Sequence, residues 1–207
     1  MTDEQYKAHF RLTRTTTQRA LQQVDQGEHF EKKLLLFLYY IGSIISFKKV
    51  ATLFGISVSS AWRYVDCVLT VLLMLKDRVI RLPSDEACVA SANAVQQAKG
   101  FYGFVGAVDG CHIPIERPRE DEHTYVNRKG YHSLVLMGVC DENMIFTDIN
   151  VGWPGSVHDS RIFKNTSLGK SLCDGSRRLP NRCFLLGDSA FQLESWLMTP
   201  FRENQIG

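Results

Sequence analysis

Two aspartates, Asp109 and Asp188, are candidate ligands of a divalent metal ion. Asp109 follows the apolar run F-V-G-A-V, and Asp188 follows C-F-L-L-G. An aspartate at the end of a buried strand points into a cleft, although the same setting is typical of an ordinary turn. If both strands belong to one sheet, the carboxylates converge, and at about 4 Å they repel by roughly 4 kcal/mol at an effective dielectric near 20. Oxygen ligands of this kind favour a divalent cation such as magnesium.

A further polar segment, V-G-W-P-G-S-V-H-D-S-R, lies between the two aspartates. Its Pro-Gly pair predicts a turn, and we expect Ser156 to cap a helix whose first residues include His158 and Asp159. These two residues are candidate auxiliary members of the site. The alternative interpretation is a capping and packing motif. A His-Asp pair also occurs in metal phosphohydrolases, but this sequence offers no further His and Asp ligands at suitable spacing.

These side chains need a scaffold, and the glycine and proline distribution indicates its nature. Three of the 15 glycines precede residue 99, and five of the six prolines follow it. Because these residues mark turns and strand ends, residues 1–98 are predicted to be helical and residues 99–207 to form a mixed sheet with helices, an α+β or α/β fold. Apolar spacing predicts helices over 6–24, 30–41, 84–99 and 156–165. It also predicts four strands, the first over 103–108 with a continuation at 113–115, and the others over 131–140, 144–151 and 183–186.

Residues 47–66 have the pattern of a helix-turn-helix, within a region of about 46–75. Ala51 is small enough for two helices to cross closely, Gly55 accepts the positive φ of the turn, and Ser57 is suited to cap the second helix. The predicted shared core is Val50, Phe54, Ile56, Ala61 and Tyr64. The predicted DNA-binding residues are Lys48, Lys49, Ser57, Ser59, Ser60, Trp62 and Arg63. The alternative interpretation is an ordinary helical hairpin.

Composition excludes several classes. Residues 1–98 carry 12 Lys and Arg against 9 Asp and Glu, and residues 99–207 carry 12 against 13. A mildly basic first half suits a polyanion, and acidic groups behind it suit a metal site. No run approaches the ~20 uninterrupted apolar residues of a membrane helix, and the acidic N-terminus is unlike a secretory signal. Six dispersed cysteines without a C-x-x-C pair indicate reduced, mostly buried thiols in a nuclear or cytosolic protein.

Four stretches together resemble the PIF/Harbinger transposase-derived nucleases. They are G-A-V-D-G-C-H-I-P-I, Y-V-N-R-K-G-Y-H-S, V-G-W-P-G-S-V-H-D-S-R-I-F and L-L-G-D-S-A-F-Q-L-E-S-W-L-M-T-P-F. The resemblance runs from about Phe30 to Phe201, and the helix-turn-helix lies where that family also has one. It implies an RNase H-like catalytic core with a D-D-E triad, in which the first Asp matches Asp109 and the second matches Asp188.

The family's glutamate lies some tens of residues beyond the second Asp, and Glu194 and Glu203 are too close to Asp188 to match it. We therefore expect an incomplete nuclease domain with impaired hydrolysis. The resemblance implies Mg²⁺ or Mn²⁺ as cofactor and DNA as partner, together with a separate DNA-binding partner protein. We expect a location in the nucleus, with the cytoplasm as the alternative. Two alternatives stay open. One is a non-catalytic DNA-binding or partner-binding protein, and the other is an unstable gene fragment.

Overall fold

The computed structural model describes residues 2–22, 30–43 and 45–201. The chain forms two compact units, Met1–Val79 and Ile80–Gly207. The sequence places the boundary at 98/99, whereas the structure assigns helix α6 (Asp85–Lys99) to the second unit. The physical reason is packing, because Cys88 and Ala92 of α6 share a hydrophobic core with strand residue Val105.

The first unit is helical. Its helices are α1 (Asp3–Phe10), α2 (Arg14–Gln22), α3 (Phe30–Ser43), α4 (Phe47–Phe54) and α5 (Val58–Val79). The expected single helix over 6–24 is wrong, because Arg11 adopts the left-handed conformation with φ 59° and ends α1. Residues 23 and 24 of that prediction lie outside the described residues. The helix predicted over 30–41 is confirmed and extends to Ser43.

Helices α4 and α5 meet at a tight turn. Gly55 ends α4 with φ 64°, and its N–H donates to the carbonyls of Ala51 and Thr52. The Ser57 hydroxyl accepts the N–H of Ser60 at 3.1 Å, which confirms Ser57 as the cap of α5. Ala51 and Ala61 are buried, so the two helices pack closely. The predicted core is confirmed, with Val50 also buried and Phe54, Ile56 and Tyr64 packed around it.

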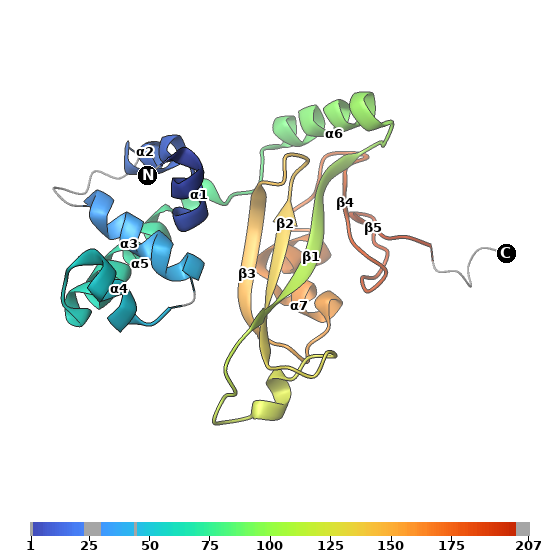
Figure 1. Ribbon diagram of the computed structural model, residues 1–207. Coiled ribbons are helices and arrows are strands. Elements are labelled where there is room, and N and C mark those ends of the chain that lie inside the picture. Colours follow the sequence, from blue (N-terminus) through green and yellow to red (C-terminus); the bar gives the residue numbers. More distant parts are fainter. Residues whose placement is uncertain (1, 23–29, 44, 202–207) are drawn as a thin grey trace. The chain divides into compact units, whose positions relative to one another are not determined.

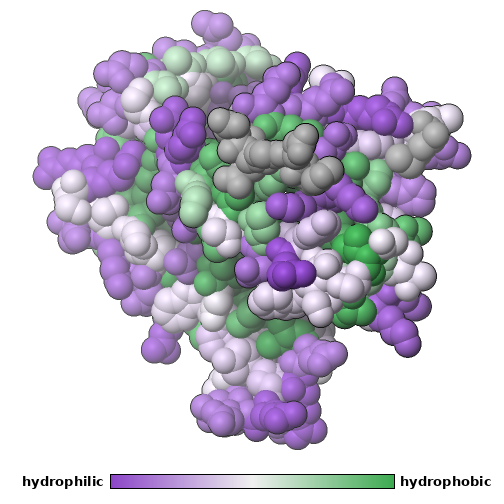
Figure 2. Space-filling view, turned by 90° about the vertical axis from the view of Figure 1, so that its left-hand side faces the viewer, coloured by the Kyte–Doolittle hydropathy of each residue, from purple (hydrophilic) through white to green (hydrophobic). Residues whose placement is uncertain are grey.

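Helix α5 also presents apolar side chains to solvent. Leu69, Leu72, Leu73 and Met74 are exposed, and Figure 2 shows hydrophobic residues reaching the surface in patches between hydrophilic ones. By length and hydropathy α5 is the one described helix that could cross a membrane. Core helices of soluble proteins meet the same criterion, so this finding is weak support for a membrane span.

The second unit is built on a five-stranded mixed sheet of order β3-β2-β1-β4-β5 (Figure 1). Its strands are β1 (Phe104–Pro114), β2 (Ser133–Cys140), β3 (Phe146–Pro154), β4 (Phe184–Leu186) and β5 (Leu197–Met198). β1, β2 and β3 pair antiparallel, whereas β4 runs parallel to β1 and β5 parallel to β4. The hairpin expected from 131–140 and 144–151 is confirmed, and so is the α+β fold class with its mixed sheet.

Short helices complete the second unit. They are η1 (Glu122–Tyr125), α7 (Asp159–Asn165) and α8 (Ser167–Cys173), and α7 lies behind the sheet in Figure 1. Ile162 and Phe163 of α7 are fully buried and pack in one core with Val108 and Met137 of the sheet. Ser84 caps α6 by accepting the N–H of Ala87, as its sequence predicts. The core therefore fixes α7 against the face of β1 on which Val108 lies.

The six cysteines are free thiols. Cys88 and Cys183 are buried, whereas Cys111 and Cys173 are exposed. The expectation of mostly buried cysteines is therefore wrong. Cys111 lies on the strand face that turns away from the α7 core, where the sequence alone gave no sign of an open surface.

Candidate active site

Asp109 lies within β1, and Asp188 lies two residues past the end of the neighbouring parallel strand β4. β1 pairs with β4 through Ala107 opposite Leu186, so each aspartate follows this pair by two residues. Both residues are exposed. The structure thus places both predicted metal ligands beside the carboxyl end of the β1–β4 pair.

Asp109 does not end its strand, as its Asp-Gly pair suggests. β1 continues to Pro114, and Asp109 pairs with Gly138 of β2. The long antiparallel pairing with β2 overrides the local turn signal. The Asp109 carboxylate accepts the N–H of Gly110 at 2.8 Å, and Asp188 accepts the N–H of Ala190 at 2.9 Å. Each carboxylate therefore keeps one oxygen committed to a neighbouring backbone amide.

The Asp159 carboxylate lies next to Gly110, on the side of the sheet opposite the Asp109 side chain. A Cβ added at Gly110 would lie 2.7 Å from Asp159 Cγ, so the Asp159 carboxylate fills the space that a side chain at 110 would take. Because Gly110 and Asp109 are adjacent in the strand, Asp159 lies on the face opposite the Asp109 side chain. Gly110 is required here by close approach. The auxiliary residue of the sequence prediction is therefore placed beneath the two candidate ligands.

The three aspartates act on one another electrostatically. Burial raises the pKa of Asp159, and the negative charges of Asp109 and Asp188 raise this pKa further. His112 and Arg128 oppose this effect and lower the same pKa. The coupling shows that the two predicted ligands and Asp159 belong to one acidic neighbourhood.

The Pro-Gly-Ser-Val segment is held by backbone contacts. Gly155 donates its N–H to the Ser133 carbonyl at 2.9 Å, and Ser156 donates to the Thr124 carbonyl at 3.1 Å. An added Cβ at Gly155 would lie 2.6 Å from the Tyr125 carbonyl oxygen, so only glycine fits. Ser156 does not cap α7, because this segment ties it to Thr124. The N-cap is His158, which makes no side-chain capping bond.

A basic loop borders Asp159. Arg128 contacts the Nδ1 atom of His158 and is itself exposed. The loop is organised by the buried side chain of Asn127, which accepts the N–H of Lys129 at 2.9 Å and donates to the Ser133 hydroxyl at 3.0 Å. A turn closed by Gly130 N–H and the Asn127 carbonyl at 2.9 Å completes it. A guanidinium is thus fixed at the edge of the acidic neighbourhood.

Sequence reasoning missed the roles of Asn127 and Arg128. The signal was available, because Asn-Arg-Lys-Gly has Asn and Gly at the first and last positions of a common turn. His112 was also missed. Its Nδ1 atom lies 3.0 Å from the Ser133 hydroxyl, so Ser133 links His112 to Asn127.

The donor set is compatible with a hard divalent cation but incomplete. Among the described residues, no three His, Cys, Asp or Glu side chains are grouped to bind one metal ion. Asp109 and Asp188 supply carboxylate oxygens, the ligand type that Mg²⁺ and Mn²⁺ prefer. Asp159 lies on the face opposite the Asp109 side chain.

The predicted DNA-binding side chains of α4 and α5 are mostly exposed. Lys48, Lys49, Ser59, Trp62 and Arg63 reach solvent. Ser60 differs, because it is half-buried and its hydroxyl lies 2.9 Å from that of Ser57 and accepts from Arg63 at 3.4 Å. Three of the exposed residues, Ser59, Trp62 and Arg63, line a shallow hollow together with Phe47 and Val58.

Comparison with known proteins agrees with these observations. A family model described as "DDE superfamily endonuclease" matches residues 108–206, a range that contains all three aspartates. The rat protein "Putative nuclease HARBI1" is 37% identical over 147 residues, which is 70% of this chain and 41% of that protein. The Xenopus laevis protein of the same name is 31% identical over 147 residues, 70% of this chain and 42% of that protein.

A plant relative extends the similarity. "Protein ALP1-like" of Arabidopsis thaliana is 26% identical over 187 residues, 82% of this chain and 44% of that protein. The chain thus spans about two fifths of the length of the curated relatives it matches. No solved structure matches it significantly.

Proposed function

Because the chain belongs to the Harbinger-derived family of DDE superfamily endonucleases, we propose that its second unit contributes to metal-dependent hydrolysis of DNA phosphodiester bonds. The observation that carries this proposal is that Asp109 and Asp188 each follow the paired residues Ala107 and Leu186 of β1 and β4 by two positions. Two carboxylates beside the same strand pair, with neither buried, are suited to hold a cation that meets a phosphate from solvent.

Residues of this chain have separate roles in the proposed hydrolysis. Asp109 and Asp188 bind Mg²⁺ or Mn²⁺, which when bound provides Lewis-acid stabilisation of charge on the reacting phosphate. Arg128 neutralises a neighbouring phosphate, since a guanidinium matches its oxygens in a bidentate manner. His158 restricts the orientation of Arg128 through their contact. Asn127 acts indirectly, because its buried amide fixes the loop that carries Arg128.

Paired measurements of metal binding and cleavage test this proposal. Asp109→Asn removes one ligand charge while keeping the hydrogen-bonding shape, and Glu116→Gln is the matched control on an exposed residue of the same unit. We expect Asp109→Asn to weaken Mn²⁺ binding, measured by titration calorimetry, and to abolish Mg²⁺-dependent nicking of plasmid DNA. Glu116→Gln should change neither. Equal Mn²⁺ affinity in Asp109→Asn and the control would remove Asp109 from the metal site.

A second candidate function is DNA binding without cleavage. It is favoured by the lack of any three-residue metal-binding group among residues 2–22, 30–43 and 45–201. It is also favoured by the α4–α5 geometry, in which a capped second helix presents Ser59, Trp62 and Arg63 to solvent. A DNA ligand would place the protein's action in the nucleus, either alone or with a separate DNA-binding protein.

Salt dependence of duplex binding tests this second function. Lys48→Gln/Lys49→Gln should reduce the slope of log K against log salt by about 2, since each phosphate contact contributes about 0.9. Lys7→Gln/Arg19→Gln is the control, because both residues are exposed helical cations of the same unit outside α4 and α5. Equal slopes for the two variants, measured by fluorescence anisotropy, would show that α4 does not contact phosphates.

A further inference from the structure

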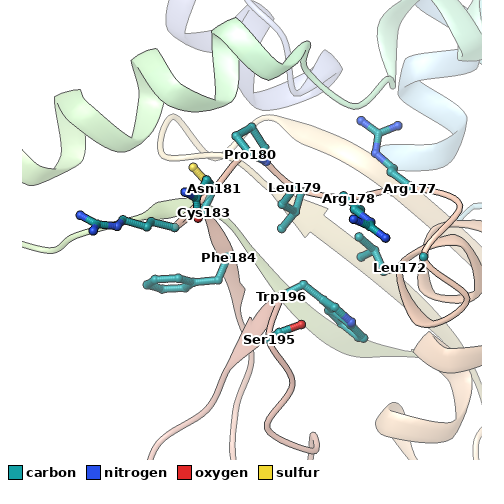
Figure 3. A pocket seen from close by; sticks show the side chains of 12 residues that line it. Leu172, Arg177, Arg178, Leu179, Pro180, Asn181, Cys183, Phe184, Ser195 and Trp196 are labelled. Atoms are coloured by element: carbon teal, nitrogen blue, oxygen red, sulfur yellow. The ribbon is translucent and has the colours of Figure 1, made fainter.

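A basic pocket opens at the end of β4 remote from Asp188. It has a volume of about 340 Å³ and lies beside the segment that joins α8 to β4 (Figure 3). Its lining includes Arg177, Arg178 and Arg182, and it includes no Asp or Glu. The volume falls in the range of small-ligand sites. Nothing in the proposed hydrolysis uses this pocket.

The charge of the pocket contrasts with that of its unit. Residues 80–207 carry 13 Lys and Arg against 15 Asp and Glu, a formal charge of −2. Three of those 13 cations lie within the six residues 177–182. None of the ion pairs between described residues involves these arginines. Arg182 interacts with the Tyr102 side chain, and no carboxylate lines the pocket, so the local concentration of guanidinium groups favours an anionic ligand.

The segment that carries the arginines is fixed by its backbone. Arg177 donates its N–H to the Ser171 carbonyl at 2.9 Å, and Cys183 donates to the Pro180 carbonyl at 2.9 Å. Arg182 adopts the left-handed conformation with φ 63°, which costs a non-glycine residue free energy. The arginines are therefore presented on a defined loop, so less entropy is lost when they bind.

The rest of the lining is aromatic and apolar. Trp196 is half-buried, and its ring centroid lies 6.0 Å from that of the buried Phe163. Phe184 also lines the pocket and packs edge-on to Phe101. In Figure 3 the rings of Phe184 and Trp196 extend to opposite sides, and Arg178 lies on the side of Trp196. Rigid aromatic rings beside arginines are the combination that binds unpaired bases and their phosphates.

We propose that this pocket binds an unpaired nucleotide of a DNA strand, with the arginines on its phosphates and Trp196 or Phe184 against its base. The inference rests on the proposed nuclease function, because it places the pocket along the strand to be cut. Cys183 and Asp188 are five residues apart, at most about 16 Å at 3.3 Å per residue. At about 3.4 Å per stacked nucleotide, the pocket would hold a nucleotide no more than about five positions from the cleaved bond.

Equilibrium binding to oligothymidylate tests the proposal without cleavage. The full chain carries Asp109→Asn, and EDTA is present, so failure of the hydrolysis proposal cannot affect the result. The test variant adds Arg177→Gln/Arg178→Gln/Arg182→Gln. The control adds Arg81→Gln/Arg119→Gln/Lys170→Gln, which removes the same charge from exposed residues of the same unit outside the pocket.

We expect the test variant to reduce the slope of log K against log salt by about 2, since each single-strand phosphate contributes about 0.7. An abasic strand of equal length should bind the unaltered pocket about tenfold more weakly than oligothymidylate, because base stacking is lost. Equal slopes for test and control variants would overturn the proposal. So would competition by polyglutamate as strong as that by oligothymidylate, which would identify an acidic peptide as the ligand. If thermal unfolding shows that the triple variant is not folded, Arg178→Gln and Arg182→Gln serve singly, each with a slope change of about 0.7.

Discussion

Replacement of Gly110 by alanine tests the central geometry of the site. The added methyl would lie 2.7 Å from Asp159 Cγ and 3.1 Å from Oδ2, whereas ordinary contacts begin at 3.4 Å. Asp159 Oδ1 would lie nearer still, so the Asp159 carboxylate must move by about 1.1 Å. Helix α7 cannot shift with it, because Ile162 and Phe163 are fully buried in the core. Only rotation of the Asp159 side chain remains.

The expected cost follows from overpacking. Extra methyl groups in a well-packed site destabilise by about 1–3 kcal/mol, so Gly110→Ala should lower the free energy of unfolding by that amount. In an Asp159→Ala background the obstructing atoms are gone. There the same change should be neutral or stabilising by about 0.5–1 kcal/mol, because glycine weakens a strand through backbone entropy. The sign of the effect should thus change with residue 159.

Urea denaturation of the four proteins in this cycle measures the effect. Residues in contact show coupling energies of about 0.5–3 kcal/mol, and independent sites add within about 0.5 kcal/mol. Gly42→Ala is the control, because its added methyl meets only the flexible Arg11 side chain and the His9 carbonyl beyond 3 Å. Additive effects of Gly110→Ala and Asp159→Ala would refute the placement of Asp159 over Gly110, and with it the assignment of Asp159 and Asp109 to opposite faces.

Two further predictions follow from the same neighbourhood. Because burial, Asp109 and Asp188 raise the pKa of Asp159 above its ordinary 3.8, the folded state binds its proton more tightly than the unfolded state does. Its stabilising contribution is present below pH 3.8 and is lost as pH rises through the folded pKa, so the stability of Asp159→Asn relative to wild type should increase as pH rises above 3.8. Denaturation at a series of pH values that showed no such trend would contradict this. Asn127→Ala should lower the free energy of unfolding by about 1–3 kcal/mol, because it leaves the buried Ser133 hydroxyl and the Lys129 N–H without this partner. Asn165→Ala, at an exposed residue with one helical hydrogen bond, is its control, and an equal loss in both would show that the Asn127 loop is not specially stabilised.

The strands that lead to Asp109 and Asp188 could be predicted because both aspartates follow apolar runs, and these runs form the paired strands β1 and β4. The caps were predictable for a similar reason, since Ser57 and Ser84 act on amides three residues away. Such features are set by local chemistry, and tertiary contacts did not change them.

Other features depend on contacts between distant segments. Nothing near Arg11 indicates that a non-glycine residue will adopt positive φ there. The Ser156 prediction failed because the Ser156 amide bonds to the Thr124 carbonyl, more than thirty residues earlier. The face on which Asp159 lies also could not be predicted from the sequence, because it depends on the packing of α7 against Val108.

The second unit has a negative formal charge, so any contact with DNA must be made at local basic sites. With a formal charge of −2, residues 80–207 do not attract a polyanion as a whole. A phosphate approaching Asp109 and Asp188 is repelled by both carboxylates unless a cation stands between them. Arg128 on one side, and Arg177 to Arg182 at the far end of β4, are the places where the repulsion is locally reversed. Substrate affinity of this unit should therefore depend on a few guanidinium groups and on the bound cation, and only weakly on net charge.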